Sequence, residues 1–291
     1  MLKKTLISVA LIASMCLTLC SCRDKYGHYF FEKKEGDDYV AGLNSYEENS
    51  SEAEVSSQID PEKASYTVKY ENSQGKKTVT TESGRIIVCE IDVNIPVFKI
   101  SSPDIDCTKS ERAVNEYFGL LAREYELEGD NLGKDALEEQ QKASENNSYF
   151  APFEYSITYQ ITKCTKIISA AFVNYQYLGG VHGSTFIEGH TLSAVTGEEL
   201  KLDDIVKNKE AFYEYSAEYV RQVLDGGEYN PDDGYETKLL DVLKEAPWYL
   251  TNDGLVFVIN EYIIAPYSEG AYQITIPYSE AADYFVDGLV K

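Results

Sequence analysis

Apolar and polar residues alternate along several short segments, which is the pattern of half-buried β-strands. The clearest segment is 85–97, where every second position from Ile87 to Ile95 is apolar, and Pro96 is expected to end this strand. Turns are expected at 72–75 and at 252–254, each between two strands. The predicted strands are 66–70, 77–81, 85–97, 153–161, 166–178, 185–195, 248–250, 255–264 and 272–276.

Helical spacing of apolar residues appears in other segments. Thr108-x-x-Glu111 has the form of a capping box, and apolar residues follow it at helical spacing as far as Tyr125. A more polar helix continues over 134–145. Further helices are predicted at 202–206, at 212–224 before Gly226-Gly227, after Asp233, and at 279–288.

Strands and helices occur in runs and hairpins, without regular βαβ alternation. This order predicts an α+β fold with antiparallel sheets and packed helices, in two closely associated subdomains. We place the first subdomain at 66–149 and the second at 150–291.

The N-terminal residues have the pattern expected of a targeting signal. Lys3 and Lys4 precede an apolar run over 5–19, and Leu19-Cys20-Ser21-Cys22 has the lipobox pattern. We expect residues 1–21 to be a lipoprotein signal peptide and Cys22 to carry a lipid that anchors the protein on the extracytoplasmic side of a bacterial membrane or outer membrane. The alternative is an ordinary secretory signal followed by a chance cysteine. The acidic, Ser-rich segment 22–65 is expected to be a disordered tether.

The chain is strongly acidic. It has 26 Lys and Arg residues against 49 Asp and Glu, and removing Lys3 and Lys4 with the signal peptide leaves 24 against 49. This balance argues against nucleic acid as a partner, because phosphates require basic residues. It suits a basic protein partner, although solubility alone also explains it.

The cysteines suggest no redox or zinc chemistry. After cleavage, Cys89, Cys107 and Cys164 remain beside the lipid-bearing Cys22, so at most one internal disulfide can form. Cys89 falls on the apolar phase of its strand and is expected to be buried and inert. No Cys-x-x-Cys follows the signal peptide.

The standard catalytic motifs are absent, so we expect no enzyme activity, no cofactor and no metal. The three histidines are His28, His182 and His190, and their spacing does not support a shared zinc ion. The pairs Asp203-Asp204 and Asp232-Asp233 are typical of helix starts. An alternative is that paired carboxylates serve an envelope glycan or peptide hydrolase. A third hypothesis is that the protein is a structural lipoprotein of the cell envelope.

Two glycine-bearing segments stand apart from these elements. The segment 177–183 has three glycines in five positions, more than a hairpin turn needs, which is consistent with a bulge or a ligand-facing loop. In the segment 262–270, Pro266 stops regular strand pairing and leaves Tyr267 on a loop. The alternative for each segment is that its glycines or proline only form a turn and that it binds no ligand.

Together with other motifs, these segments resemble a known family. The order of the motifs is similar to that of the domain of unknown function at the C-terminus of RsiV-type anti-sigma factors, over about 153–291. Less clearly, 66–149 resembles the PdaC-type domain that often precedes it. The motifs are Gly-Gly-x-His-Gly at 179–183, Thr-Gly-x-x-Leu-x-Leu-x-Asp at 196–204, Trp-x-Leu-Thr-x-x-Gly-Leu at 248–255, Ile-Ala-Pro-Tyr-x-x-Gly at 264–270 and Ile-Pro-Tyr at 276–278.

The resemblance implies a binding module, because RsiV-type proteins bind lysozyme through this extracellular region. It makes lysozyme or a cell-wall component the expected partner. Anti-sigma action is not expected, since no spanning segment is predicted. PdaC is a deacetylase through a separate catalytic domain, which we do not find. The candidate ligand-binding residues are Gly179, Gly180, His182, Pro266 and Tyr267.

Overall fold

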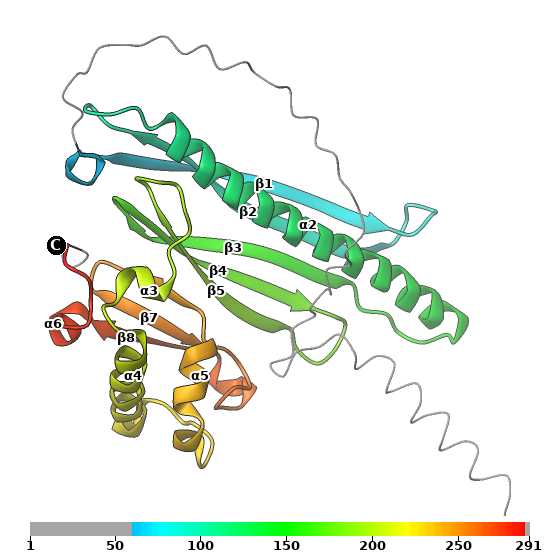
Figure 1. The fold of residues 1–291 in the computed structure, drawn as a ribbon. Coiled ribbons are helices and arrows are strands. Elements are labelled where there is room, and N and C mark those ends of the chain that lie inside the picture. Colours follow the sequence, from blue (N-terminus) through cyan, green and yellow to red (C-terminus); the bar gives the residue numbers. More distant parts are fainter. Residues whose placement is uncertain (1–59, 289–291) are drawn as a thin grey trace, which may run out of the picture. The chain divides into compact units, whose positions relative to one another are not determined.

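The structure, a computed structural model, describes residues 60–288, which Figure 1 shows as a ribbon. The predicted lipid site at Cys22 and the tether as far as residue 59 lie outside the described residues. Within the described part, no helix combines the length and the apolar character that crossing a membrane requires.

Ordered contacts begin before the predicted start at Tyr66. A short 3-10 helix, η1 (Pro61–Lys63), follows Asp60, whose side chain accepts a hydrogen bond from the Glu62 N–H. Ala64 is buried. The predicted tether therefore overlaps with the fold at residues 60–65. This segment is polar and is held partly by backbone hydrogen bonds, which composition does not reveal.

A five-stranded sheet forms the centre of the first half of the fold. Its strands lie in chain order, and every neighbouring pair is antiparallel except β2 and β3, which are parallel. Helix α2 (Thr108–Glu145) makes the long crossover that a parallel pair requires. The α+β class is confirmed, with this one parallel pairing. The strands are β1 (Thr67–Thr80), β2 (Ile87–Ser101), β3 (Phe153–Cys164), β4 (Ile167–Tyr177) and β5 (Ser184–Ser193).

The first two strands are longer than predicted. β1 runs without a break through the expected turn, with Asn72 opposite Pro96 and Gly75 opposite Val93 in β2. The actual turn lies after Thr80. Pro96 also fails to end its strand, because β2 pairs with β3 only as far as Val93. Beyond Val93 that side of β2 is an edge, where a proline costs no ladder hydrogen bond.

Helix α2 begins at Thr108 as predicted, but without the capping box. The Glu111 carboxylate instead accepts hydrogen bonds from the Ile100 N–H and from Lys99, both at 2.8 Å, and so holds the helix against β2. Further along the helix, two glycines allow a close approach to the sheet. A Cβ at Gly129 would lie 2.9 Å from the Ile91 side chain, and one at Gly133 would lie 2.7 Å from Val79.

A three-stranded antiparallel sheet follows in the second half, with order β6-β7-β8. The predicted hairpin at 252–254 is confirmed, since β6 and β7 pair across it. β7 stops at Ile259 instead of Ile264, and the last helix is a single turn. The elements are α3 (Leu202–Ile205), α4 (Lys209–Val223), the π-turn η2 (Leu224–Glu228), η3 (Tyr235–Thr237), α5 (Leu239–Glu245), β6 (Trp248–Leu250), β7 (Gly254–Ile259), η4 (Tyr267–Glu269), β8 (Tyr272–Pro277) and α6 (Tyr278–Ala281).

Three apolar clusters join these elements into layers. Helix α2 covers one face of the five-stranded sheet, where Phe118 stacks on Phe172. The preceding residue, Ala171, faces the opposite side and packs in a small cluster with β6 and β7. Helices α4 and α5 cover the far face of the three-stranded sheet, where Phe212 contacts Phe257. The order is therefore helix, sheet, sheet, helices (Figure 1).

The five-stranded sheet spans the predicted subdomain boundary between residues 149 and 150. β3, β4 and β5 complete the sheet begun by β1 and β2, so a division at 149 would cut one sheet in two. The change from the first sheet to the second falls between β5 and α3. Sequence reasoning missed this because the parallel pairing of β2 with β3 joins segments on either side of a 38-residue helix.

Candidate functional site

The first predicted loop connects β4 to β5 and owes its shape to its glycines. Gly179 has φ +75°, and a Cβ there would also press on the Ala151 carbonyl oxygen at 3.3 Å. The Tyr177 hydroxyl donates a hydrogen bond to the Gly180 carbonyl at 3.0 Å. Val181 at the tip is fully exposed. The tip of the loop is therefore exposed to solvent, while its base is held by the Tyr177 hydrogen bond and by packing at Gly179.

The second predicted loop follows β7 and is fastened to the start of β5. The buried Asn260 side chain accepts from the Ile187 N–H at 2.8 Å and donates to the Ile187 carbonyl at 3.0 Å. The next residue, Glu261, accepts from the Thr185 N–H at 3.2 Å. Two consecutive side chains therefore continue the hydrogen bonding of β5 in place of another strand.

The two loops meet in a stack of aromatic rings. The His182 and Tyr267 rings lie 3.8 Å apart between centroids, with 15° between their planes. Tyr262 continues the stack, at 5.9 Å from Tyr267 and 27°. Tyr262 is 60% exposed and has φ +64°, an unusual conformation for a bulky residue. This stack of His182, Tyr267 and Tyr262 is hereafter the aromatic stack.

The hydrogen bonding of His182 fixes its tautomer. The Nδ1 atom lies 2.9 Å from the Gly183 carbonyl oxygen, which can only accept, so Nδ1 carries a proton. A Cβ at position 183 would lie 2.4 Å from the Tyr175 ring, so a larger residue there would force that ring to shift. The ring is therefore held by a backbone contact on one side and by Tyr267 on its face.

A carboxylate lies beside the aromatic stack. Burial raises the pKa of the Glu261 carboxyl above its usual value of 4.5, while the Thr185 N–H and the charge of His182 oppose this rise. The site thus combines the exposed rings of His182 and Tyr262 with a partly desolvated acid.

The structure brings the predicted residues of the two loops together. His182 and Tyr267 are in direct contact, and Pro266, which is exposed, precedes Tyr267 as the N-cap of η4. Gly179 and Gly180 shape the first loop. Sequence reasoning missed the contributions of Asn260, Glu261 and Tyr262. No local pattern marked them, because their roles depend on contact with β5 and on a positive φ.

The predicted acidic pair at 203–204 forms a helix start. Asp204 accepts from the Lys201 N–H at 2.7 Å, and Asp203 pairs with Lys209 at 2.6 Å. These contacts give no support to the hydrolase alternative. Among residues 60–288, no group of three or more His, Cys, Asp or Glu side chains is arranged to hold a metal ion.

The three described cysteines are free thiols. Cys89 is buried, as predicted, and Cys107 is buried too. Burial raises the pKa of the Cys89 thiol to about 11. Such thiols are mostly protonated near neutral pH and are poor nucleophiles.

Comparisons with known families match two segments of the chain. The family described as Deacetylase PdaC matches residues 83–185, from the turn before β2 to the start of β5. The family described as a protein of unknown function, DUF3298, matches residues 202–279, from α3 to the start of α6. His182 lies in the first segment and Tyr267 in the second, so the aromatic stack joins the two.

Solved structures share the fold. A DUF3298-family protein of Bacteroides fragilis has 18% sequence identity and a TM-score of 0.58, and the match covers 77% of this chain and 96% of that one. A DUF3298-family protein of Pseudomonas aeruginosa has 15% identity and a TM-score of 0.48, over 76% of this chain and 95% of that one. No curated protein sequence matches significantly. The similarity to the Bacteroides fragilis structure concerns the fold alone. The two family matches show that the chain contains a PdaC-like domain at 83–185 and a DUF3298 domain at 202–279.

Proposed function

We propose that this protein is a non-enzymatic binding module, anchored by a lipid on Cys22 outside the bacterial cytoplasm, and that it captures a protein or cell-wall ligand with the aromatic stack. The observation that carries the proposal is the contact between His182 and Tyr267. It places the exposed ring of His182 and the half-buried ring of Tyr267, from two domains, on one surface, held in position before any ligand arrives.

The chemistry of the aromatic stack suits a binding surface. Tyr and other aromatic residues are enriched in protein interfaces, because a rigid ring covers a large area at a small cost in side-chain entropy. The hydrogen bonds of Asn260 and Glu261 to β5 fix the second loop, which lowers the ordering cost of binding. Val181, fully exposed beside His182, adds apolar surface.

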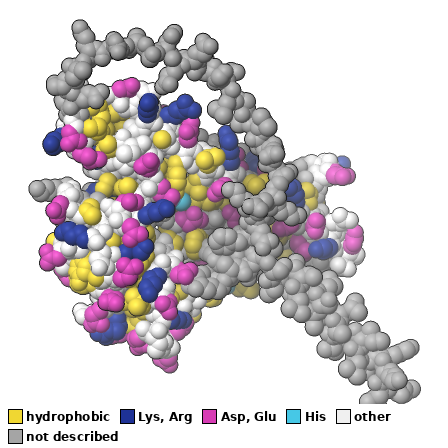
Figure 2. Space-filling view, in the orientation of Figure 1, with side chains coloured by type: hydrophobic (Ala, Val, Ile, Leu, Met, Phe, Trp, Pro, Cys, Tyr) yellow, Lys and Arg dark blue, Asp and Glu magenta, His cyan; other side chains and the backbone are white. Residues whose placement is uncertain are grey.

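The charge of the protein favours a basic partner. Acidic side chains outnumber basic ones in the sequence, and Figure 2 shows them distributed over the visible face with basic groups among them. Such a surface speeds the approach of a cationic protein at low salt. The resemblance to RsiV-type ectodomains makes lysozyme, which is basic, the first partner to test.

The experiment measures lysozyme binding to the full chain in detergent micelles, at low and at moderate salt. The key variant carries Tyr262→Ala and Tyr267→Ala together, and the matched control is Tyr149→Ala. Tyr149 is 89% exposed and lies outside both loops. We expect the double variant to lose at least about tenfold in affinity, as for interface hot spots, and the control to lose nothing.

Two outcomes would overturn parts of the proposal. No binding to lysozyme at either salt concentration would reject lysozyme as the ligand, and purified cell-wall sacculi would then be tested with the same variants. Binding that survives in the double variant would reject the aromatic stack as the site. It would also favour a structural role in which other surfaces hold the partner.

The anchor has its own test. A Cys22→Ser variant should neither incorporate labelled fatty acid in cells nor sediment with membranes. Cys89→Ser is a matched control, since Cys89 is buried inside the fold. Membrane association of the Cys22→Ser protein without fatty-acid incorporation would contradict the lipid anchor.

A further inference from the structure

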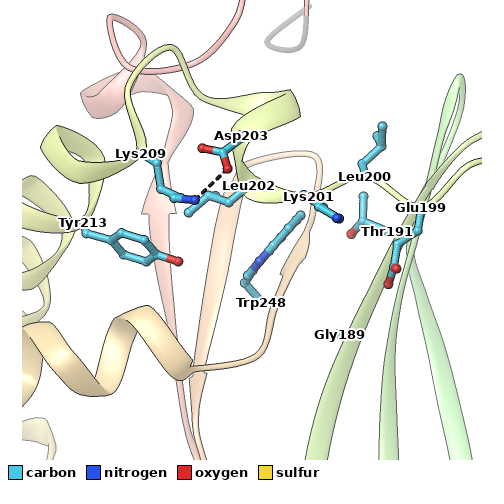
Figure 3. A pocket seen from close by; sticks show the side chains of 10 residues that line it. All are labelled: Gly189, Thr191, Glu199, Leu200, Lys201, Leu202, Asp203, Lys209, Tyr213 and Trp248. Atoms are coloured by element: carbon cyan, nitrogen blue, oxygen red, sulfur yellow. Dashed lines mark hydrogen bonds and ion pairs between the residues drawn. The ribbon is translucent and has the colours of Figure 1, made fainter.

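A cavity of about 310 Å³ lies away from the loop residues, and no member of the aromatic stack lines it. Its walls come from β5, the segment that leads into α3, helix α4 and β6, and Figure 3 shows their side chains. Trp248 projects among them from β6 (Figure 3). Trp248 is the single tryptophan of the sequence. The volume is at the lower end for ligand pockets and suits a ligand of one ring.

The walls are held in place by contacts behind them. Glu199 accepts a hydrogen bond from the Tyr117 hydroxyl at 2.7 Å, and Tyr117 is in turn bonded to His190 at 2.8 Å. A Cβ at Gly189 would lie 1.9 Å from the Trp248 carbonyl oxygen, so glycine is needed for β6 to lie this close to β5. A cavity with such fixed walls needs little reorganisation on binding.

One wall hydroxyl has a proton to donate. Thr191 and Ser169 are hydrogen-bonded to each other at 2.7 Å, and the Ser169 oxygen also accepts from the Leu250 N–H. If Thr191 were the donor, the fully buried Ser169 O–H would have no acceptor, which is costly. Ser169 is therefore the donor, and the Thr191 proton is left for a group inside the cavity.

Other polar groups of the walls are also available. None of the described residues accepts a hydrogen bond from the Trp248 indole N–H, and none pairs with the Lys201 ammonium. The second oxygen of Glu199 remains an acceptor. The cavity thus offers both donors and acceptors beside an aromatic ring.

The charges around the cavity balance. Lys209 and Asp203 already form an ion pair at 2.6 Å, and Lys201 and Glu199 contribute one charge of each sign. A strongly charged ligand would gain little net attraction and would compete with the existing pair. The walls therefore favour a neutral ligand rich in hydroxyl groups.

We propose that this cavity binds a single neutral pyranose ring of a carbohydrate. The C–H face of the sugar lies against the Trp248 indole, and its hydroxyls pair with Thr191, Lys201 and Glu199. A hydroxyl both donates and accepts, so a sugar can use all of these groups without a change in protonation. This site is separate from the aromatic stack and does not depend on it.

The test uses the emission of Trp248, recorded at excitation wavelengths that spare tyrosine. The full chain in detergent is titrated with methyl hexopyranosides, including the glucoside, the galactoside and the N-acetylglucosaminide. We expect a saturable change in emission with at least one of them. Glu199→Gln and Lys201→Met should each weaken binding about five- to tenfold, the effect of losing one hydrogen bond. Lys76→Met on the exposed face of β1 is the matched control and should bind as the wild type does.

Three outcomes would overturn the proposal. One is the absence of any saturable change up to the solubility of the sugars, confirmed by ligand-observed NMR. Another is undiminished sugar binding in both Glu199→Gln and Lys201→Met, when circular dichroism shows that both variants are folded. The third is stronger binding of a zwitterion, tested with L-alanine and L-glutamine, which would assign the cavity to amino acids. None of these outcomes affects the lysozyme experiment, because that experiment tests binding at the aromatic stack.

Discussion

The imidazole of His182 lies flat on the phenol ring of Tyr267, with 3.8 Å between the ring centroids and 15° between the planes. His182 belongs to the PdaC-like domain and Tyr267 to the DUF3298 domain. The contact therefore links the two domains at their exposed loops. A ligand that binds this surface touches both domains at once.

Replacing Tyr267 should change the surroundings of His182 without unfolding the protein. In Tyr267→Ala, the imidazole protons of His182 lose the ring current of the phenol, and their NMR resonances should move toward the values of a free histidine. Tyr267 is only half-buried, so the thermal midpoint should change little. Unchanged His182 resonances would show that the stack does not persist in solution, and Tyr149→Ala is the control.

Removing His182 should raise the pKa of Glu261 further. Burial already raises this pKa above 4.5, and the charge of His182 counters the rise. A carboxyl with a raised folded-state pKa contributes stability below its unfolded pKa and loses that contribution as the pH passes its folded pKa. In His182→Ala the loss should move to higher pH, measured by carboxyl NMR titration and by urea unfolding from about pH 4 to 7. A lower Glu261 pKa in the variant would contradict the assignment.

The Asn260 side chain should be important for stability. In Asn260→Ala, the N–H and the carbonyl of Ile187 both lose their partner in a buried place. We expect the free energy of unfolding to fall by about 2–4 kcal/mol, since each unsatisfied buried group is costly. Urea denaturation measures this. Asn72→Ala on the exposed face of β1 should change stability by less than about 0.5 kcal/mol. Equal effects of the two substitutions would be inconsistent with the role given to Asn260.

Two glycine substitutions should act in opposite directions. In Gly189→Ala, the new methyl group would lie 1.9 Å from the Trp248 carbonyl oxygen, so the two sheets must separate locally. We expect a loss of about 3 kcal/mol, the upper range for overpacking. Gly119→Ala adds a methyl group with nothing within 4 Å in the middle of α2 and should stabilise the protein by about 0.5–1 kcal/mol. Thermal and urea unfolding of both variants test the pair. A Gly189→Ala protein as stable as the wild type would mean that the strands are not this close.

The buried thiols should be unreactive in the folded protein. Alkylation requires the thiolate, and burial raises the pKa of Cys89 to about 11. At about pH 8, iodoacetamide should modify Cys89 only after unfolding in urea, while the half-buried Cys164 should react faster. Mass spectrometry of the labelled peptides measures both rates. Labelling of Cys89 in the native protein at the rate of a free thiol would contradict its burial.

Much of the local structure follows from periodicity in the sequence. The alternation after Phe153 predicted β3, and the helical spacing after Thr108 predicted α2. The turn at 252–254 predicted the hairpin of β6 and β7. These features depend on neighbours a few residues apart, and the side-chain pattern records them directly.

Features that depend on distant partners were predicted poorly. Gly75 sits in a turn-like sequence but lies within a continuous strand, because β2 provides a partner along its length. The predicted subdomain boundary at 149 falls within the span of the five-stranded sheet, because β2 and β3 pair across α2. Likewise, Glu111 fits a capping box, yet its carboxylate is used by Ile100 and Lys99.

From the sequence alone, most of the elements could be predicted, along with the excess of acidic residues and the two loops that contain Gly179, His182, Pro266 and Tyr267. The stacking of His182 on Tyr267, and its extension by Tyr262, became visible in the three-dimensional fold. The reason is physical: the second loop reaches His182 because Asn260 and Glu261 bond to the backbone of β5, and such contacts between distant segments leave no periodic trace in the chain.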